Sequence, residues 1–294
     1  MANLKAIRIR IASFKSTRQI TSAMKMVSAA KLRKAQDKIV RLRPYANKLH
    51  ELLVNVSLSL ADSEIENIYA RVSAPGKILL VVITSNRGLC GAFNTNVINE
   101  ARRVISEKYP DQFLSGNLTI LPIGKKGFDF FRRRNAKMLP DQNALFNDLT
   151  FDNVSALAEQ VMKSFTLKEF DRVELIYNQF KNAAVQNLTN EVFLPVETVV
   201  KGKLKAAPVD YIYEPNKEEI VKELIPKSLK IQFYKAILDS YVAEHGARMT
   251  AMHKATDNAT ALIRDMTLQY NKARQATITN QILEVVSGAE ALKG

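Results

Sequence analysis

The chain has 294 residues, 47% of them hydrophobic, and its 43 Lys and Arg against 29 Asp and Glu give a net charge of +14. This composition is globular and argues against general disorder, and no apolar run reaches the ~18 residues that a membrane-spanning helix needs. The single cysteine, Cys90, excludes an intramolecular disulfide and is compatible with a reducing compartment. Such a basic chain favours an acidic partner, which could be nucleic acid, an anionic membrane surface or an acidic protein surface.

A heptad pattern occupies the first sixty residues. Its average spacing of 3.5 residues predicts one long helix over 1–60 that pairs with a second helix in a coiled coil. This segment holds 13 Lys or Arg and only 2 acidic residues, so 13 − 2 = 11 of the net positive charges lie on it. The seam positions are Leu4, Ile7, Ile11, Phe14, Arg18, Thr21, Lys25, Ser28, Leu32, Ala35, Ile39, Leu42, Ala46, Leu49, Leu53, Val56 and Leu60.

The seam is interrupted over 18–28, where polar residues take the core positions and apolar residues spread around the helix. Two interpretations stay open: a phase shift that packs Met24 and Val27 against the same partner helix, or a segment enclosed by other subunits. Pro44 predicts a kink or a boundary. The Arg-rich, acid-free residues 1–20 also fit a mitochondrial transit peptide, but the uninterrupted heptad phase there favours mature structure.

The middle of the chain has a different pattern, in which apolar strands alternate with helices. Such alternation predicts βαβ units, and therefore a Rossmann-like α/β domain over 75–210 with a mainly parallel sheet. A turn at 74–76 precedes this domain and a basic loop at 201–208 follows its last strand. The predicted strands are 77–84, 118–123, 172–178 and 189–196, and the predicted helices are 94–108, 125–134 and 153–168.

A second long helix is predicted over 216–290, with an interrupted heptad seam from Ile231 to Ser287. Two long seams at opposite ends of one chain most simply pair as an antiparallel coiled coil, with the α/β domain inserted between them. Apolar residues lie on several sides of 276–292, which indicates that another molecule encloses this end. The second seam is Ile231, Tyr234, Leu238, Tyr241, His245, Arg248, Met252, Ala255, Ala259, Leu262, Met266, Gln269, Ala273, Ala276, Asn280, Leu283 and Ser287.

The segment TSNRGLCGAFN at 84–94 lies where a strand gives way to a helix, which is a frequent place for a phosphate-binding loop. It lacks both the G-x-G-x-x-G spacing and the Gly-Lys-Ser/Thr ending of known loops of this kind, so we predict a structural turn. The three histidines have no metal-ligand spacing, and no acid-base pair stands out. We expect no catalytic residue, cofactor or metal.

Four motifs resemble the gamma subunit family of ATP synthases, in the right order and over essentially the whole chain: ITSAMKMVSAAKLRKAQ (20–36), TSNRGLCGAFN (84–94), ARMTAMHKATDNA (247–259) and ITNQILEVVSGAEAL (278–292). The resemblance implies a non-catalytic rotary shaft that couples proton- or sodium-driven rotation of the c-subunit ring to conformational changes at beta-subunit nucleotide sites. It implies as partners three alpha and three beta subunits, the epsilon subunit and the c ring. A peripheral location on the cytoplasmic face of a bacterial plasma membrane follows, with membrane contact only through the complex.

The resemblance also implies which residues meet the surrounding subunits. Met24, Lys25 and Met26 match the stretch that faces the beta subunits, and Arg274, Gln275 and Thr279 match positions near the tip. Where the family motif usually has Glu, this chain has Gln281, so an ion pair there is absent or replaced by a neutral hydrogen bond.

Two alternatives from other classes remain at this stage. One is a nucleotide-dependent enzyme that uses the α/β domain, and the other is a coiled-coil nucleic-acid-binding protein that uses the basic helix. The basic helix has few aromatic residues for stacking on bases, which weakens the second alternative.

Overall fold

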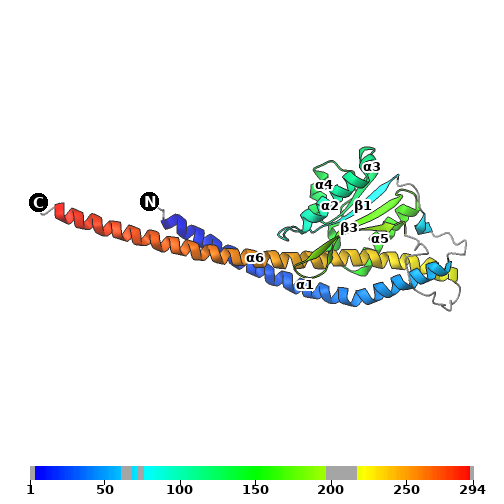
Figure 1. Ribbon diagram of the computed structural model, residues 1–294, viewed down its shortest axis with the longest axis horizontal. Coiled ribbons are helices and arrows are strands. Elements are labelled where there is room, and N and C mark those ends of the chain that lie inside the picture. The colour runs from blue at the N-terminus through cyan, green and yellow to red at the C-terminus, as the bar shows by residue number, and fades with distance from the viewer. Residues whose placement is uncertain (1–3, 61–67, 72–75, 197–216, 292–294) are drawn as a thin grey trace. The chain divides into compact units, whose positions relative to one another are not determined.

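The computed structural model describes residues 4–60, 68–71, 76–196 and 217–291 (Figure 1). The chain divides into two compact units, Met1–Ala29 with Arg248–Gly294, and Ala30–Ala247. Helices α1 (Leu4–Leu60) and α6 (Lys217–Ala291) each contribute to both units. The turn predicted at 74–76, apart from Gly76, and the basic loop predicted at 201–208 lie outside the described residues.

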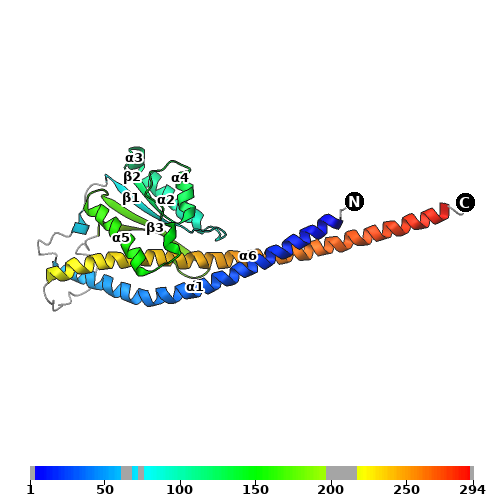
Figure 2. The ribbon, with the colours of Figure 1, turned by 180° about the vertical axis from the view of Figure 1, so that it is seen from behind.

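The first unit is an antiparallel pair of helices. The Thr256 hydroxyl lies 2.8 Å from that of Thr21, and the Arg8 guanidinium donates to the Tyr270 hydroxyl at 2.8 Å. Moving forward along α6 therefore means moving back along α1, and the two views in Figures 1 and 2 show both chain ends at the same end of the pair. These contacts confirm the predicted pairing and fix its register.

Burial along α1 follows the predicted seam. In the first unit, Ile7, Ile11 and Phe14 are half-buried while their neighbours along the helix are exposed, and Thr21 and Ser28 are buried. In the second unit, Leu32, Ala35, Ile39 and Leu49 of α1 are buried, and the side chains of the predicted seam residues Leu53, Val56 and Leu60 lie outside the described ones. Arg18, which the pattern put on the seam, is exposed, and the helix continues through Pro44 without ending.

The predicted seam of α6 is only partly correct. Met252, Ala259, Met266 and Ala273 are buried or half-buried as expected, but Leu262, Gln269 and Ala276 are exposed. At each of those three positions the next residue along the helix is half-buried instead. The buried surface therefore shifts by one residue at alternate turns, beginning where Ala255 and Thr256 are both half-buried. The residues that take the seam instead are Ile263, Tyr270 and Thr277.

The second unit contains a four-stranded sheet with the order β2-β1-β3-β4. Strands β1 (Ile78–Ile83), β2 (Leu118–Ile123) and β3 (Arg172–Phe180) are parallel, as predicted. Strand β4 (Gln186–Leu194) is an antiparallel edge strand that begins and ends earlier than predicted. It forms a hairpin with β3, in which the side chain of Asn182 accepts hydrogen bonds from the backbone of the turn.

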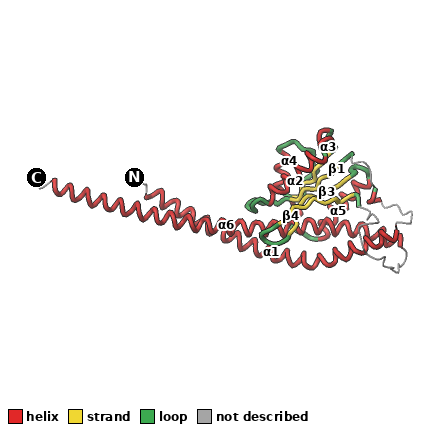
Figure 3. The backbone as a smooth tube through the Cα atoms, in the orientation of Figure 1, coloured by secondary structure: helices red, strands yellow, loops and turns green. Residues whose placement is uncertain are grey.

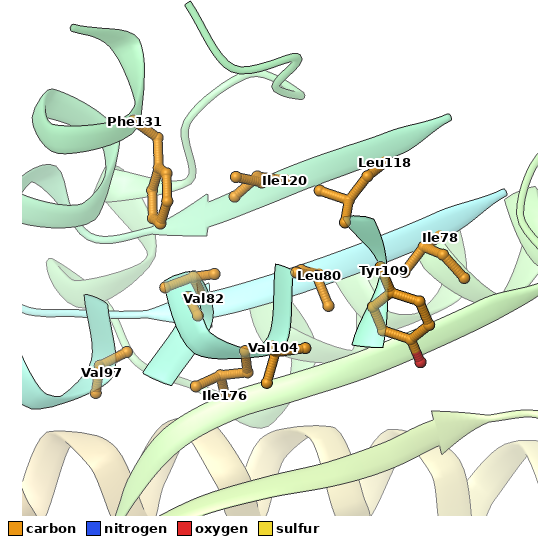
Figure 4. Packing of buried hydrophobic residues seen from close by; sticks show 11 residues of the cluster. Ile78, Leu80, Val82, Val97, Val104, Tyr109, Leu118, Ile120, Phe131 and Ile176 are labelled. Carbon is orange, nitrogen blue, oxygen red and sulfur yellow. The ribbon is translucent and has the colours of Figure 1, made fainter. Parts of the chain in front are cut away.

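Helices α2 (Phe93–Lys108) and α4 (Lys125–Arg132) cover one face of this sheet. Figure 4 shows the core between them and the strands, with alternate side chains of β1 pointing into the same layer. Six consecutive residues of β1 are fully buried because helices cover both faces of a parallel sheet. This core comprises Ile78, Leu80, Val82, Val97, Ala101, Val104, Tyr109, Leu118, Ile120, Phe131 and Ile176.

Helix α5 (Phe151–Thr166) and the part of α6 in this unit cover the opposite face (Figure 3). Phe193 of β4 packs against Phe233 of α6 with ring centroids 5.3 Å apart, and Phe151 meets Tyr234 edge-on at 5.6 Å. The shorter elements are α3 (Pro110–Leu114), η1 (Ile68–Ala70) and η2 (Asn143–Phe146). Among the described helices, none carries an apolar stretch long enough to cross a bilayer.

Candidate partner-binding surface

The turn after β1 is held together by its own polar groups. The Ser85 amide donates to the Asn94 side chain at 2.9 Å, and the Asn94 amide donates back to the Ser85 hydroxyl at 2.8 Å. The Gly127 amide donates to the Thr84 hydroxyl at 2.8 Å, which ties the turn to α4. Cys90 is buried. These contacts agree with a structural turn, in which the side chains of Thr84, Ser85 and Asn94 hold the backbone of the segment in place.

A buried acidic cluster joins α6 to the sheet and to α1. Asp239 is fully buried, and Arg43 donates to its carboxylate at 3.2 Å and to the Phe180 carbonyl at 3.0 Å. Burial raises the pKa of Asp239, and the Arg43 cation offsets part of that rise. Glu191 accepts a hydrogen bond from Tyr177 at 3.3 Å, and burial raises the pKa of this carboxyl as well. These groups attach elements to one another and form no catalytic arrangement.

Glu174 of β3 is a second buried carboxylate, with the opposite pKa shift. The Tyr109 hydroxyl donates to it at 2.6 Å and Arg172 donates at 2.9 Å. Burial alone would raise its pKa, but hydrogen bonds from Tyr109, Asn190 and Arg172 outweigh that effect and the pKa of Glu174 is lowered. This carboxylate therefore stays ionised and anchors the end of α2 to the sheet. Over the described ranges, no group of three His, Cys, Asp or Glu side chains could hold a metal ion.

The predicted interface residues of α1 lie at the edge of the helix pair. Met24 and Lys25 are half-buried, whereas the side chain of Met26 is 63% exposed. Ile20 and Val27 are also exposed. Ile20 and Val27 share one side of the helix, next to the buried seam positions, whereas Met26 points about 100° away from Val27 at 3.6 residues per turn, so the exposed apolar side chains form two patches.

The predicted interface residues near the end of α6 are all exposed: Arg274, Gln275, Thr279 and Gln281. The Thr279 hydroxyl donates to the Gln275 carbonyl within the helix at 3.0 Å. Since Thr256 lies opposite Thr21, this group sits about 30–40 Å further along α6 than the level of Met24, at 1.5 Å per residue. The structure does not bring the two predicted groups together, so they would meet different parts of a partner.

A larger apolar surface includes two of these residues, Thr279 and Gln281, and extends beyond them. The sequence pattern predicts that another molecule encloses this end of the chain, but none of the large apolar side chains there was predicted as a contact. Every residue from 278 to 291 is exposed, and Val285 reaches 72%. Its only charges are Glu284 and Glu290. We call this segment the apolar tip. Its large exposed side chains are Ile278, Ile282, Leu283, Val285 and Val286.

These features define a class of protein: a coiled-coil shaft that carries an inserted α/β domain and offers surfaces for partners. Comparison with known proteins is specific. The ATP synthase family model "ATP-synt" matches residues 3–292. The chain is 56% identical to the ATP synthase gamma chains of Flavobacterium johnsoniae and Flavobacterium psychrophilum, over the whole length of all three, and 50% identical to that of Cytophaga hutchinsonii over 99% of each chain.

Solved structures agree. A chain of the Tetrahymena thermophila mitochondrial ATP synthase central stalk and c ring is 26% identical, with a TM-score of 0.57 over 80% of this chain and 99% of that one. A Euglena gracilis mitochondrial ATP synthase chain, at 22% identity, has the same fold, with a TM-score of 0.66 over 98% and 94%. The chain belongs to the ATP synthase gamma-chain family. It is a non-catalytic rotor subunit of the central stalk of the F1 sector. Family membership therefore decides against both alternatives from the sequence analysis, the nucleotide-dependent enzyme and the nucleic-acid-binding protein.

Proposed function

We propose that the apolar tip and the exposed apolar side chains of α1, Ile20, Met26 and Val27, are the surfaces through which this rotor acts on the alpha and beta subunits. The observation that carries the proposal is the full exposure of the apolar tip. An isolated helix end with this many large apolar side chains and two charges would be an aggregation hazard unless a partner encloses it. Three alpha and three beta subunits around the tip would supply that enclosure.

On this proposal the shaft works by population shift. Its surface is not symmetric around its axis, because the exposed apolar side chains Ile20, Met26 and Val27 belong to α1 and the apolar tip belongs to α6 alone. Each orientation would contact one beta subunit differently from the next, and so favour one conformation of its nucleotide site. The epsilon subunit and the c ring would bind the α/β domain. Ion flow through the ring would then turn the shaft at the cytoplasmic face of a bacterial plasma membrane, with membrane contact only through the complex.

Polar substitution of the apolar tip tests the first surface. Ile282→Gln, Leu283→Gln and Val286→Gln together should leave the chain folded, since all three side chains are exposed, but should lower ATP hydrolysis by a complex reconstituted from purified alpha and beta subunits at least tenfold. The matched control replaces three exposed leucines of the second unit, Leu114, Leu167 and Leu188, by Gln. Equal activity of the tip variant and the unmodified chain would contradict the proposal.

Charge reversal at Lys25 tests the second surface. We expect Lys25→Glu to reduce coupling between rotation and hydrolysis several-fold, because a half-buried cation at the edge of the pair would face an acidic partner. Thermal unfolding of the α/β domain should not change. Lys163→Glu, on the exposed side of α5, is the control of equal charge. If both variants couple equally well, Lys25 has no part in the contact.

A further inference from the structure

A small pocket in the second unit lies between α1, α6 and the loop after η2. Its volume is about 200 Å³, below the ~300 Å³ lower bound for sites that bind drug-sized ligands. On one side stand three lysines of α1, and on the other Phe146 and Tyr241, whose rings stack at 6.1 Å with an interplanar angle of 15°. The lining is Lys31, Lys34, Ala35, Lys38, Phe146, Asn147, Asp148, Leu149, Leu238 and Tyr241.

The three lysines point to the same side of the helix. Lys31, Lys34 and Lys38 are spaced by three and four residues, which places them within about 60° of one another at 3.6 residues per turn. All three are exposed. Across the part of the chain that the structure describes, none of the ion pairs includes them.

The pocket contains one acid, and this acid is already engaged. Asp148 accepts hydrogen bonds from the Asn153 amide through its carboxylate at 3.2 Å and its carbonyl at 3.0 Å, at the start of α5. Three cations against one engaged carboxylate leave the lining with a formal charge of +2. Like charges this close raise each other's energy, so an anion that bridges them gains from all three.

We propose that this pocket binds a phosphoryl-bearing anion, with Lys31, Lys34 and Lys38 as its ligands. Ammonium groups on flexible stems bind phosphate oxygens as point charges without requiring the planar geometry of arginine. The small volume favours a short phosphoryl chain over an extended acidic peptide. Such a chain occurs free, as in pyrophosphate, and as the tail of a nucleotide, whose base could stack on the half-buried rings of Phe146 and Tyr241.

Calorimetric titration of the full chain with pyrophosphate at ~0.15 M salt tests the site. We expect one equivalent to bind, and we expect Lys31→Gln, Lys34→Gln and Lys38→Gln together to weaken binding at least tenfold. The control removes the same number of charges from the same helix at exposed positions outside the pocket, through Lys15→Gln, Arg33→Gln and Arg41→Gln. It should change the affinity less than twofold.

Three results would overturn the proposal. Equal weakening in both triple variants, or binding of several equivalents, would mean that charge along the helix attracts the anion nonspecifically. No binding at all would mean that the pocket is not an anion site. Displacement of pyrophosphate by an equimolar polyglutamate peptide would overturn it in favour of a protein partner. If the triple variant of Lys31, Lys34 and Lys38 does not fold, two other measurements give the same test. One is the affinity of the single variant Lys34→Gln for pyrophosphate, and the other is the change in the NMR amide shifts of Phe146 and Leu149 when pyrophosphate is added to the unmodified chain. ADP binding equal to that of pyrophosphate identifies a free phosphoryl anion, whereas tighter ADP binding that Phe146→Leu abolishes identifies a nucleotide.

Discussion

Replacing Gly124 by alanine is expected to destabilise the α/β unit by at least about 3 kcal/mol, which is in the range of severe core substitutions. Gly124 begins α4 with φ +108°, a conformation that residues with a side chain rarely adopt. A β-carbon there would lie 2.1 Å from the Thr84 carbonyl oxygen. Because that oxygen belongs to the backbone at the end of β1, no side-chain rotation can relieve the clash.

The control for this prediction is Gly116→Ala. Gly116 also has a positive φ, of +71°, but its β-carbon would meet no atom within 4 Å. Backbone strain alone should then cost about 1 kcal/mol. Urea denaturation monitored by circular dichroism, together with hydrogen exchange of the β1 amides, gives the loss of unfolding free energy in each variant. The difference between the two losses is the cost of the close contact, since both variants share the cost of the backbone strain. Equal losses in the two variants would mean that the turn after β1 can move away from α4.

Arg43→Ala should destabilise the second unit by about 2–3 kcal/mol. The substitution leaves the Asp239 carboxylate buried without its cation, and breaking a buried ion pair typically costs about 3–5 kcal/mol. The lower figure applies because 40% of the Arg43 side chain is exposed and water screens part of the interaction. Adding Asp239→Asn to the variant should restore part of the loss, and Arg41→Ala, at an exposed position of the same helix, should have little effect.

The loss should grow with pH. Asp239 has a pKa raised by burial, so the folded state holds its proton more tightly than the unfolded state, and stability falls as the pH rises from the unfolded value of about 3.9 through the folded one. Removing Arg43 raises this pKa further. The difference in unfolding free energy between the variant and the unmodified chain should therefore be larger at pH 8 than at pH 5, and hydrogen exchange of the β3 amides at both pH values measures it. A difference that does not change with pH would exclude Asp239 as its cause.

Much of the fold was predictable because its patterns are local. The apolar run of β1 and the 3.5-residue seam of α1 each depend on neighbouring residues. The structure confirms the run of β1, and among the described side chains it confirms the seam of α1 except at Arg18. The seam of α6 was less determined, since Leu262 and Ile263 are both apolar and either could face α1. Only the register of the partner helix decides between them, and the contact between Thr21 and Thr256, 235 residues apart, sets that register.

The candidate surface was predictable in kind and not in detail. The predicted contacts near the tip rest on resemblance, and they are polar or charged. The structure shows that the same end of α6 also exposes the large apolar side chains of the apolar tip. The buried ion pair of Arg43 and Asp239 joins residues 196 positions apart, so the local sequence pattern does not predict it. One signal was available: Asp239 is the only charged residue in the mainly apolar stretch 236–243, and a charge in such a place requires a buried partner.

The apolar tip has a mechanical consequence as well as a chemical one. Along most of the first unit two helices lie side by side, and a pair resists bending more than a single helix because its material lies further from the neutral axis. From Ile278 onward α6 extends past the described part of α1 and continues as one helix, with every residue to Ala291 exposed. A single helix bends more easily than a pair, so within the first unit the exposed end of α6 should be more compliant than the paired section, where the hydrogen bond between Thr21 and Thr256 links the two helices.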